Sequence, residues 1–326
     1  MPDAADRCGL FVPRGAEVPA MNDQALVSTG DLYESCTRTL ERTLEEYETS
    51  DLADITTLLT PLEQTTRMVP RARRLRGSAA LDWMRLHAAV TATMAGAAYD
   101  RGRHSDAVSL ADRAATVARA AGDSALAGRS LAVRARVVRQ HSPAVALQLA
   151  GAAGRIAGTS PARAMITGKV TAGSYAAVGD VTGVRNAVTR AWKIMEKLDA
   201  STQGRPGFAL DTYSPADLAL ACAEALTTVG VPEEATPHLE RAAALIADSG
   251  QTGMIVAVHM ARARTVLARD RPNLDEAENH VAHAVTLSAQ RPAEWVARLV
   301  RDISALAGRR TGHHMDDLVA ATSAWS

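Results

Sequence analysis

A short phrase that recurs along the chain constrains its fold more than any other feature. In residues 99–107 (YDRGRHSDA) a glycine is followed five positions later by an alanine, and residues 229–235 (VGVPEEA) repeat this spacing. Small or aliphatic residues then follow at four and seven positions, namely Ala111 and Ala114 in the first copy and Leu239 and Ala242 in the second. Glycine ends a helix because it adopts the left-handed conformation without steric penalty, and a stripe of small side chains lets two helices pack closely. The phrase therefore predicts pairs of helices.

Weaker copies of the phrase extend this pattern over most of the chain. The marker positions are residues 107, 146, 184, 235 and 277, which are 39, 38, 51 and 42 residues apart. A period of this size is typical of stacked helix pairs. We expect helices at 31–48, 51–68, 78–100, 105–121, 124–140, 143–157, 161–178, 182–199, 215–229, 233–248, 252–269, 273–289 and 292–308. The 51-residue interval contains residues 199–214 (DASTQGRPGFALDTYS), whose Gly, Pro and polar residues predict a long loop between pairs.

The composition agrees with an all-α chain whose helices lie close together. Alanine makes up roughly a fifth of the residues, far above ordinary usage, whereas aromatic residues make up 3%. A β-sandwich or barrel would depend on Val, Ile, Tyr and Phe, so we exclude these folds. The 36 basic residues balance the 36 acidic ones, and the chain as a whole therefore does not attract nucleic acid or an anionic membrane. No apolar run reaches the roughly 18 residues that a spanning helix needs.

The cysteines and the chain ends contain few signals. Cys8, Cys36 and Cys222 show no CxxC spacing, which predicts neither a disulfide framework nor a zinc knuckle and favours the cytoplasm. The first twenty residues lack the apolar run of a signal peptide. We expect four segments, which are a disordered or extended tail (1–30), a helical pair with a basic connector (31–76), the repeat region (77–308) and a C-terminal tail (309–326). The connector contains Arg67, Arg71, Arg73, Arg74 and Arg76.

The glycine turn with its alanine stripe resembles the tetratricopeptide repeat (TPR) over roughly residues 78–308. This resemblance implies a TPR-like right-handed α-solenoid of antiparallel helix pairs. Residues 98–104 (AYDRGRH), residues 117–123 (VARAAGD) and the long loop before 215–248 make the region similar to the C-terminal TPR sensor domain of actinobacterial Xre-type helix-turn-helix transcriptional regulators. Residues 1–30 are too few to form the DNA-binding domain of that family, so we expect no direct binding to nucleic acid.

The resemblance also indicates where a ligand would bind, because the first helix of each pair lines the concave groove of such a solenoid. The residues projected into the groove are Thr93, Gly96, Tyr99, Lys169, Gly173, Asp217, Glu224, Thr227, His259, Arg262 and Arg269. This mixture of basic, acidic and hydroxyl groups suits a peptide, a small signalling molecule or a partner protein. We expect a non-catalytic binding or regulatory module, without a cofactor, that acts in transcriptional or specialised-metabolism regulation.

Two alternatives to this interpretation stay open. The chain contains no GxSxG, HExxH or strand-linked GxGxxG motif, which lowers the case for catalysis. However, Glu276, His280 and His283 are spaced i, i+4 and i+7, and a carboxylate with two imidazoles could bind zinc or iron in a metal-dependent enzyme. Their more ordinary interpretation is a polar flank beside a packing stripe. The second alternative is a protein-assembly adaptor, and self-association into a homodimer is left open.

Overall fold

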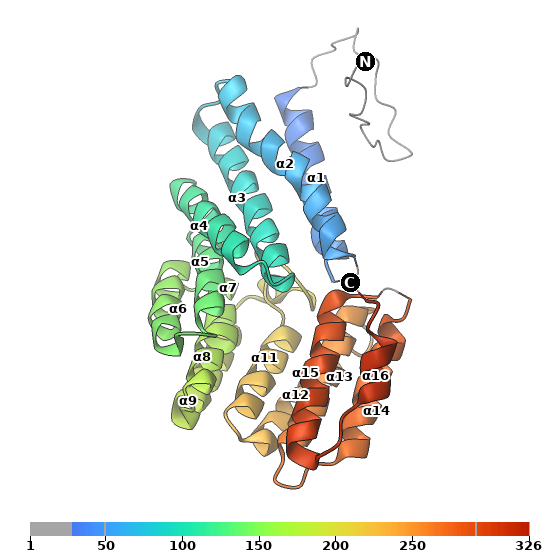
Figure 1. Ribbon diagram of the computed structural model, residues 1–326. Coiled ribbons are helices and arrows are strands. Elements are labelled where there is room, and N and C mark those ends of the chain that lie inside the picture. Colours follow the sequence, from blue (N-terminus) through green and yellow to red (C-terminus); the bar gives the residue numbers. More distant parts are fainter. Residues whose placement is uncertain (1–27, 49, 291, 326) are drawn as a thin grey trace, which may run out of the picture.

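The computed structural model describes residues 28–48, 50–290 and 292–325, and the regular elements in this part of the chain are all helices (Figure 1). The predicted all-α class is therefore confirmed. The helices are α1 (Thr29–Glu46), α2 (Leu52–Ala72), α3 (Gly77–Asp100), α4 (His104–Ala120), α5 (Ser124–Val138), α6 (Pro143–Ala157), α7 (Pro161–Met165), η1 (Ile166–Thr171), α8 (Ala172–Ala177), α9 (Val181–Met195), α10 (Ala200–Gln203), α11 (Pro215–Thr228), α12 (Pro232–Ile246), α13 (Thr252–Ala268), α14 (Leu274–Ser288), α15 (Glu294–Thr311) and α16 (Asp316–Ala321). The predicted N-terminal tail and Cys8 lie outside the described residues, apart from residues 28–30, which cap and begin α1.

Helices that follow one another in the sequence pack as adjacent pairs, including α3 with α4, α5 with α6, α11 with α12, and α13 with α14. Gly102 and Gly230 end the first helix of two of these pairs, with φ of 72° and 89° in the left-handed region. The five marker positions predicted from the repeat are each 0% exposed, and they are Ala107, Ala146, Val184, Ala235 and Ala277. The stripe of small residues is thus the surface along which the paired helices meet.

The hydrophobic core is divided into clusters that follow the order of the helices. Trp83 and Leu59 are almost fully buried in the first cluster, between α1, α2 and α3. The largest cluster extends from α5 to α13 and is built mainly from Ala, Val and Leu. Another cluster joins α13 to α16 around Val281 and Ile303. Each helix pair therefore shares its core with its neighbours along the chain.

One predicted helix differs from a regular α-helix. The segment predicted as 161–178 contains a π-helical turn, η1, between α7 and α8. A Cβ at Gly168 in this turn would overlap the Leu218 side chain and lie 3.3 Å from the Ala191 Cβ, so the turn packs closely against α9 and α11. Single π-turns inside α-helices frequently occur at functional sites, and this one includes Lys169.

The C-terminal segment, predicted only as a tail over 309–326, contains helical structure. α15 continues to Thr311, and α16 packs back against α14 and α15. Met315 is 2% exposed and its N–H donates to Ser304 Oγ at 2.9 Å. Leu318 and Val319 contact the same cluster. Because Leu318 and Val319 follow Met315 at three and four positions, the three side chains lie on one face of this short helix and pack against the core.

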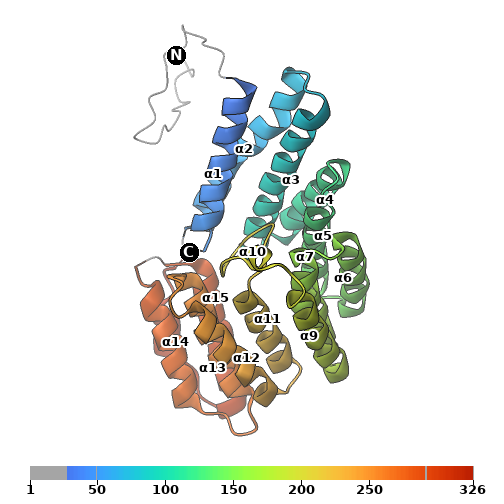
Figure 2. The same cartoon turned by 180° about the vertical axis from the view of Figure 1, so that it is seen from behind.

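The chain curls until its C-terminal helices meet the first helices again. On α15, Arg298 Nη2 donates to the carbonyl of Asp100 at the end of α3, at 3.1 Å. Gly253, at the start of α13, lies against the backbone of Glu48 just after α1. Figure 2 shows the predicted 199–214 loop, in yellow, at the centre of this arrangement, between the N-terminal, middle and C-terminal helices. Among the described residues, no helix combines the length and the apolarity that a membrane span requires.

The close contact between α5 and α6 can be tested at Gly128. A Cβ there would lie 2.7 Å from the carbonyl oxygen of Ala153 and 2.8 Å from the backbone nitrogen of Ala157. We expect Gly128→Ala to lower the free energy of unfolding by about 1–3 kcal/mol, because the helices must separate. Exposed Gly151 on α6 is the matched control, since a Cβ there meets only the flexible end of Arg155. Gly151→Ala should raise stability by up to about 1 kcal/mol through helix propensity. Urea unfolding measures both, and a stabilising Gly128→Ala would contradict this account of the packing.

Candidate functional site

A group of charged side chains from several helices meets in the middle of the molecule, around the 204–214 loop. We define the central cluster as the acidic residues Glu48, Asp100 and Asp217 with the basic residues Arg129, Arg136, Arg139 and Lys169. They come from the segment after α1 and from α3, α5, η1 and α11. Three carboxylates and four cations thus face one another where the chain closes on itself.

Asp100 joins most of the elements that surround the cluster. Its Oδ2 accepts a hydrogen bond from the Tyr47 hydroxyl at 2.9 Å, and its Oδ1 lies 3.8 Å from Arg136 Nη2. The guanidinium of Arg136 also lies 3.7 Å from the centre of the Tyr99 ring, which is a cation–π contact. Together with the bond from Arg298 to the Asp100 carbonyl, these contacts tie α1, α3, α5 and α15 to one residue.

The 204–214 loop fills the space beside this network. The Phe208 ring stacks on the Tyr47 ring with a centroid distance of 4.1 Å and an angle of 15°. A side chain at Gly96 of α3 would collide with Phe208, so the absence of a Cβ there makes room for the ring. The N–H of Gly207 donates to Asp217 Oδ2 at 3.1 Å, and Arg129 Nη1 donates to the carbonyl of Thr212 at 3.4 Å.

Burial and charge change the acidity of these groups. The pKa of Glu48 rises to about 7, because the carboxyl is buried and lies near Asp100 and Asp217, while Lys169 and the N–H of Phe208 oppose the rise. Burial also raises the pKa of Asp217 and lowers the pKa of Arg129 to about 10. Near neutral pH, Glu48 is therefore partly protonated, whereas an ordinary glutamate is ionised.

The predicted groove residues divide into two groups. Tyr99, Lys169 and Asp217 belong to the cluster or contact it. Burial lowers the pKa of Arg139, and the nearby carboxylate of Glu224 partly opposes this. The predicted Gly173 leaves room for the guanidinium of Arg139, which donates to the carbonyl of Lys169 at 3.4 Å.

The remaining predicted groove residues lie elsewhere. Thr93 is 0% exposed, and its hydroxyl donates to the Ala89 carbonyl of its own helix. Thr227 bonds to Thr265 at 2.7 Å between the two hydroxyl oxygens. Arg262 and Arg269 line a separate cavity of about 250 Å³ between α12, α13 and α14. His259 contacts histidines of α14.

Sequence reasoning did not select Arg129 and Arg136 of α5 or Arg139, which caps its C-terminal end. Arg129, Arg136 and Arg139 are spaced i, i+7 and i+10, which puts them on one face of a helix rich in Ala and Val. That spacing was the available signal. Glu48 and Phe208 carried no comparable signal, because their roles depend on the closure of the chain and on the path of a loop.

The predicted metal ligands are arranged differently from the expectation. Glu276 Oε2 accepts a hydrogen bond from Arg269 Nη1 at 3.3 Å, so this carboxylate is engaged by a cation. His280 instead approaches His259, with 3.1 Å between the two Nδ1 atoms, and the rings of His259 and His283 are 4.4 Å apart. Burial and the neighbouring histidines and Arg262 lower the pKa of His259 to about 4. Within the described residues, no three His, Cys, Asp or Glu side chains are placed to hold a metal ion, and the zinc or iron site stays a prediction.

The raised pKa of Glu48 predicts a pH-dependent effect of Glu48→Gln. The folded-state pKa of about 7 lies above the ordinary value of 4.5. As the pH rises, Glu48 therefore loses its proton at a lower pH in the unfolded chain than in the folded one. Between these two pKa values, its ionisation favours unfolding. Glutamine imitates the protonated carboxyl and does not ionise. From pH 5 to pH 8, the stability of the variant relative to the wild type should rise by about 2 kcal/mol.

Urea unfolding at the two pH values measures this difference, and the titration of His259 cancels because both proteins contain it. Glu45→Gln, at an exposed position of α1, is the control and should show no such trend. If the difference in the free energy of unfolding between Glu48→Gln and the wild type were the same at both pH values, the raised pKa would be contradicted.

No protein-family model matches the chain, and none of the curated proteins matches it. The function is therefore argued from the geometry of the central cluster and its loop.

Proposed function

We propose that this protein is a non-catalytic binding module, a TPR-like right-handed solenoid of antiparallel helix pairs that holds a peptide segment of a partner protein in its central groove. Two features support the architecture. The helices pack in adjacent pairs, and the buried marker positions follow the period of the repeat. The groove corresponds to the central cluster, where α3, α5, η1 and α11 present charged and aromatic side chains.

The proposal rests on the contacts that the 204–214 loop makes within the central cluster. Its aromatic side chain, Phe208, stacks on Tyr47. Its backbone is held through the N–H of Gly207, which donates to Asp217, and the carbonyl of Thr212, which accepts from Arg129. The N–H of Phe208 also bonds to Glu48. Side-chain pockets combined with bonds to the main chain are the means by which protein grooves recognise extended peptides. The loop therefore occupies the groove in the manner of a bound peptide.

This arrangement also supplies a means of regulation. A partner peptide has to displace the loop, and the loop connects α10 to α11 without forming part of a helix pair. The part that has to leave the groove is the tip around Phe208, since Tyr213 at the end of the loop is buried in the core. The resemblance of the repeat region to the sensing half of transcriptional regulators supports a regulatory role, in which the partner gains access only when the loop is released.

The proposal predicts that the groove binds a peptide once the loop is removed. The test uses a variant in which residues 205–210 are replaced by a Gly-Ser segment of equal length. Its probe is a fluorescent peptide with the sequence of residues 203–214. We expect the variant to bind this peptide at least about tenfold more tightly than the wild type in fluorescence polarisation, because the competing loop is gone. A peptide with alanine in place of Phe208 should bind at least about tenfold more weakly, since the stacking contact is lost.

Two controls make the result specific. Arg205→Ala changes an exposed position of the same loop and should behave like the wild type. Adding Tyr47→Ala to the loop-replaced variant should abolish the gain in affinity. Equal, weak binding by the wild type and the loop-replaced variant would rule out a peptide groove at this site.

A further inference from the structure

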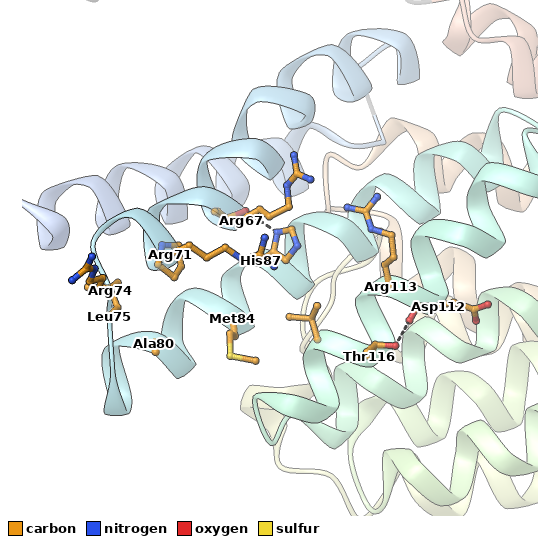
Figure 3. Close-up of a pocket in the computed structure, with 13 residues that line it drawn as sticks. Arg67, Arg71, Arg74, Leu75, Ala80, Met84, His87, Asp112, Arg113 and Thr116 are labelled. Carbon is orange, nitrogen blue, oxygen red and sulfur yellow. Dashed lines mark hydrogen bonds between the residues drawn. The ribbon is translucent and has the colours of Figure 1, made fainter.

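A second hollow of about 850 Å³ lies outside the central cluster, between α2, α3 and α4. Small-molecule sites in proteins typically have volumes of about 300–1,000 Å³. Figure 3 shows its walls, with Arg67, Arg71 and Arg74 following α2 and Arg113 at the other end, on α4. This hollow, which we name the arginine pocket, is separate from the groove of the proposed function.

The arginines of the pocket differ in how they are balanced by acidic groups. Buried Glu63 pairs with Arg113 and lies 3.8 Å from Arg67 Nε, so these two guanidinium groups are held by a carboxylate. Asp112, the acidic residue of the lining, pairs with Arg134 at 3.7 Å. The guanidinium groups of Arg71 and Arg74 have no ion-pair or hydrogen-bond partner in the part of the chain that the structure describes. The pocket therefore has unbalanced positive charge at the α2 side.

Arg74 occupies a backbone position that normally belongs to glycine. Its φ is 49°, and no other non-glycine residue among those described has a left-handed backbone. The N–H of Leu75 closes the end of α2 by donating to the Pro70 carbonyl at 2.9 Å. The same closing bond follows Gly102, where the N–H of the next residue bonds to the Ala98 carbonyl at 2.8 Å. An arginine is strained in this conformation, and such strain is often found at functional sites.

The opposite wall of the pocket is apolar. Ala80, Met84 and Val117 line it, and Figure 3 shows Met84 below the row of arginines, with Leu75 beside Arg74. The inner end is fixed by His87, whose Nδ1 lies 3.1 Å from the Thr66 hydroxyl. Arginine is well suited to bind phosphate or carboxylate oxygens through paired N–H groups, and methionine adapts to irregular apolar ligands. A ligand that fits both walls has an anionic head and an apolar tail.

We propose that the arginine pocket binds a small amphipathic phosphate ester. Its phosphate contacts the unpaired guanidinium groups of Arg71 and Arg74, and its alkyl part lies over Met84 and Val117. Neither the groove nor the 204–214 loop takes part, so this site goes beyond the proposed function and stands or falls independently of it.

The test measures the binding of octyl phosphate to the full chain by isothermal titration calorimetry, at concentrations below micelle formation. Octanol and inorganic phosphate are the comparison probes, since each presents only one half of the ligand. We expect octyl phosphate to bind at least about tenfold more tightly than either, because both walls contribute. Octanol or inorganic phosphate binding as tightly as octyl phosphate would overturn the proposal, and so would the absence of octyl phosphate binding.

Variants separate a defined site from a general attraction to positive charge. Arg71→Ala and Arg74→Gly should each weaken octyl phosphate binding at least about tenfold. Arg74→Gly is informative because glycine relieves the left-handed strain, so a loss of binding cannot be ascribed to unfolding. Arg119→Ala removes the same charge from an exposed position of α4 that does not line the pocket, and should bind like the wild type. An equal loss in Arg119→Ala and Arg74→Gly would show non-specific attraction and refute the site.

Discussion

The close approach of paired helices along stripes of small residues is the constraint on which the rest of the structure depends. Ala107, Ala111 and Ala114 are each 0% exposed, and the corresponding positions of the other pairs are similarly buried. Because alanine buries little apolar area, each contact contributes little by itself. Stability therefore comes from many contacts repeated along the chain, and each pair depends on its neighbours.

The alanine stripes bury small side chains, and Trp83 packs instead between α1, α2 and α3. A separate set of aromatic side chains lies where the repeat is interrupted. Tyr47 and Phe208 stack where the end of α1 meets the 204–214 loop, and Tyr99 contacts Arg136 at the end of α3. Charged groups gather in the same region, where the side chains of several helices converge without meeting along a stripe. The regular packing thus leaves the centre of the molecule to residues that can recognise other groups.

The helices could be predicted from the sequence because their signals are local. Gly102 and Gly230 end helices, and alanines mark the packed faces. The long loop predicted at 199–214 is irregular over 204–214, while its first residues form the short helix α10. The position of α16 was missed, because Met315, Leu318 and Val319 are too few in the mostly polar segment 309–319 to give a strong pattern. The candidate site was predicted only in part. Tyr99, Lys169 and Asp217 were selected from helix position, whereas Glu48 and Phe208 become part of the site only through chain closure, which involves residues far apart in the sequence.

The two sites differ in chemistry but share one structural element. α3 carries Asp100 and Tyr99 at its C-terminal end, within the central cluster, and it carries Met84 and His87 on the wall of the arginine pocket. Thirteen residues separate His87 from Asp100, which is about 20 Å along a helix. Between these two positions α3 packs against α2 and α4. Asp100 in turn holds Tyr47, on which Phe208 stacks. The arginine pocket and the contacts that hold the loop therefore use different parts of the same helix.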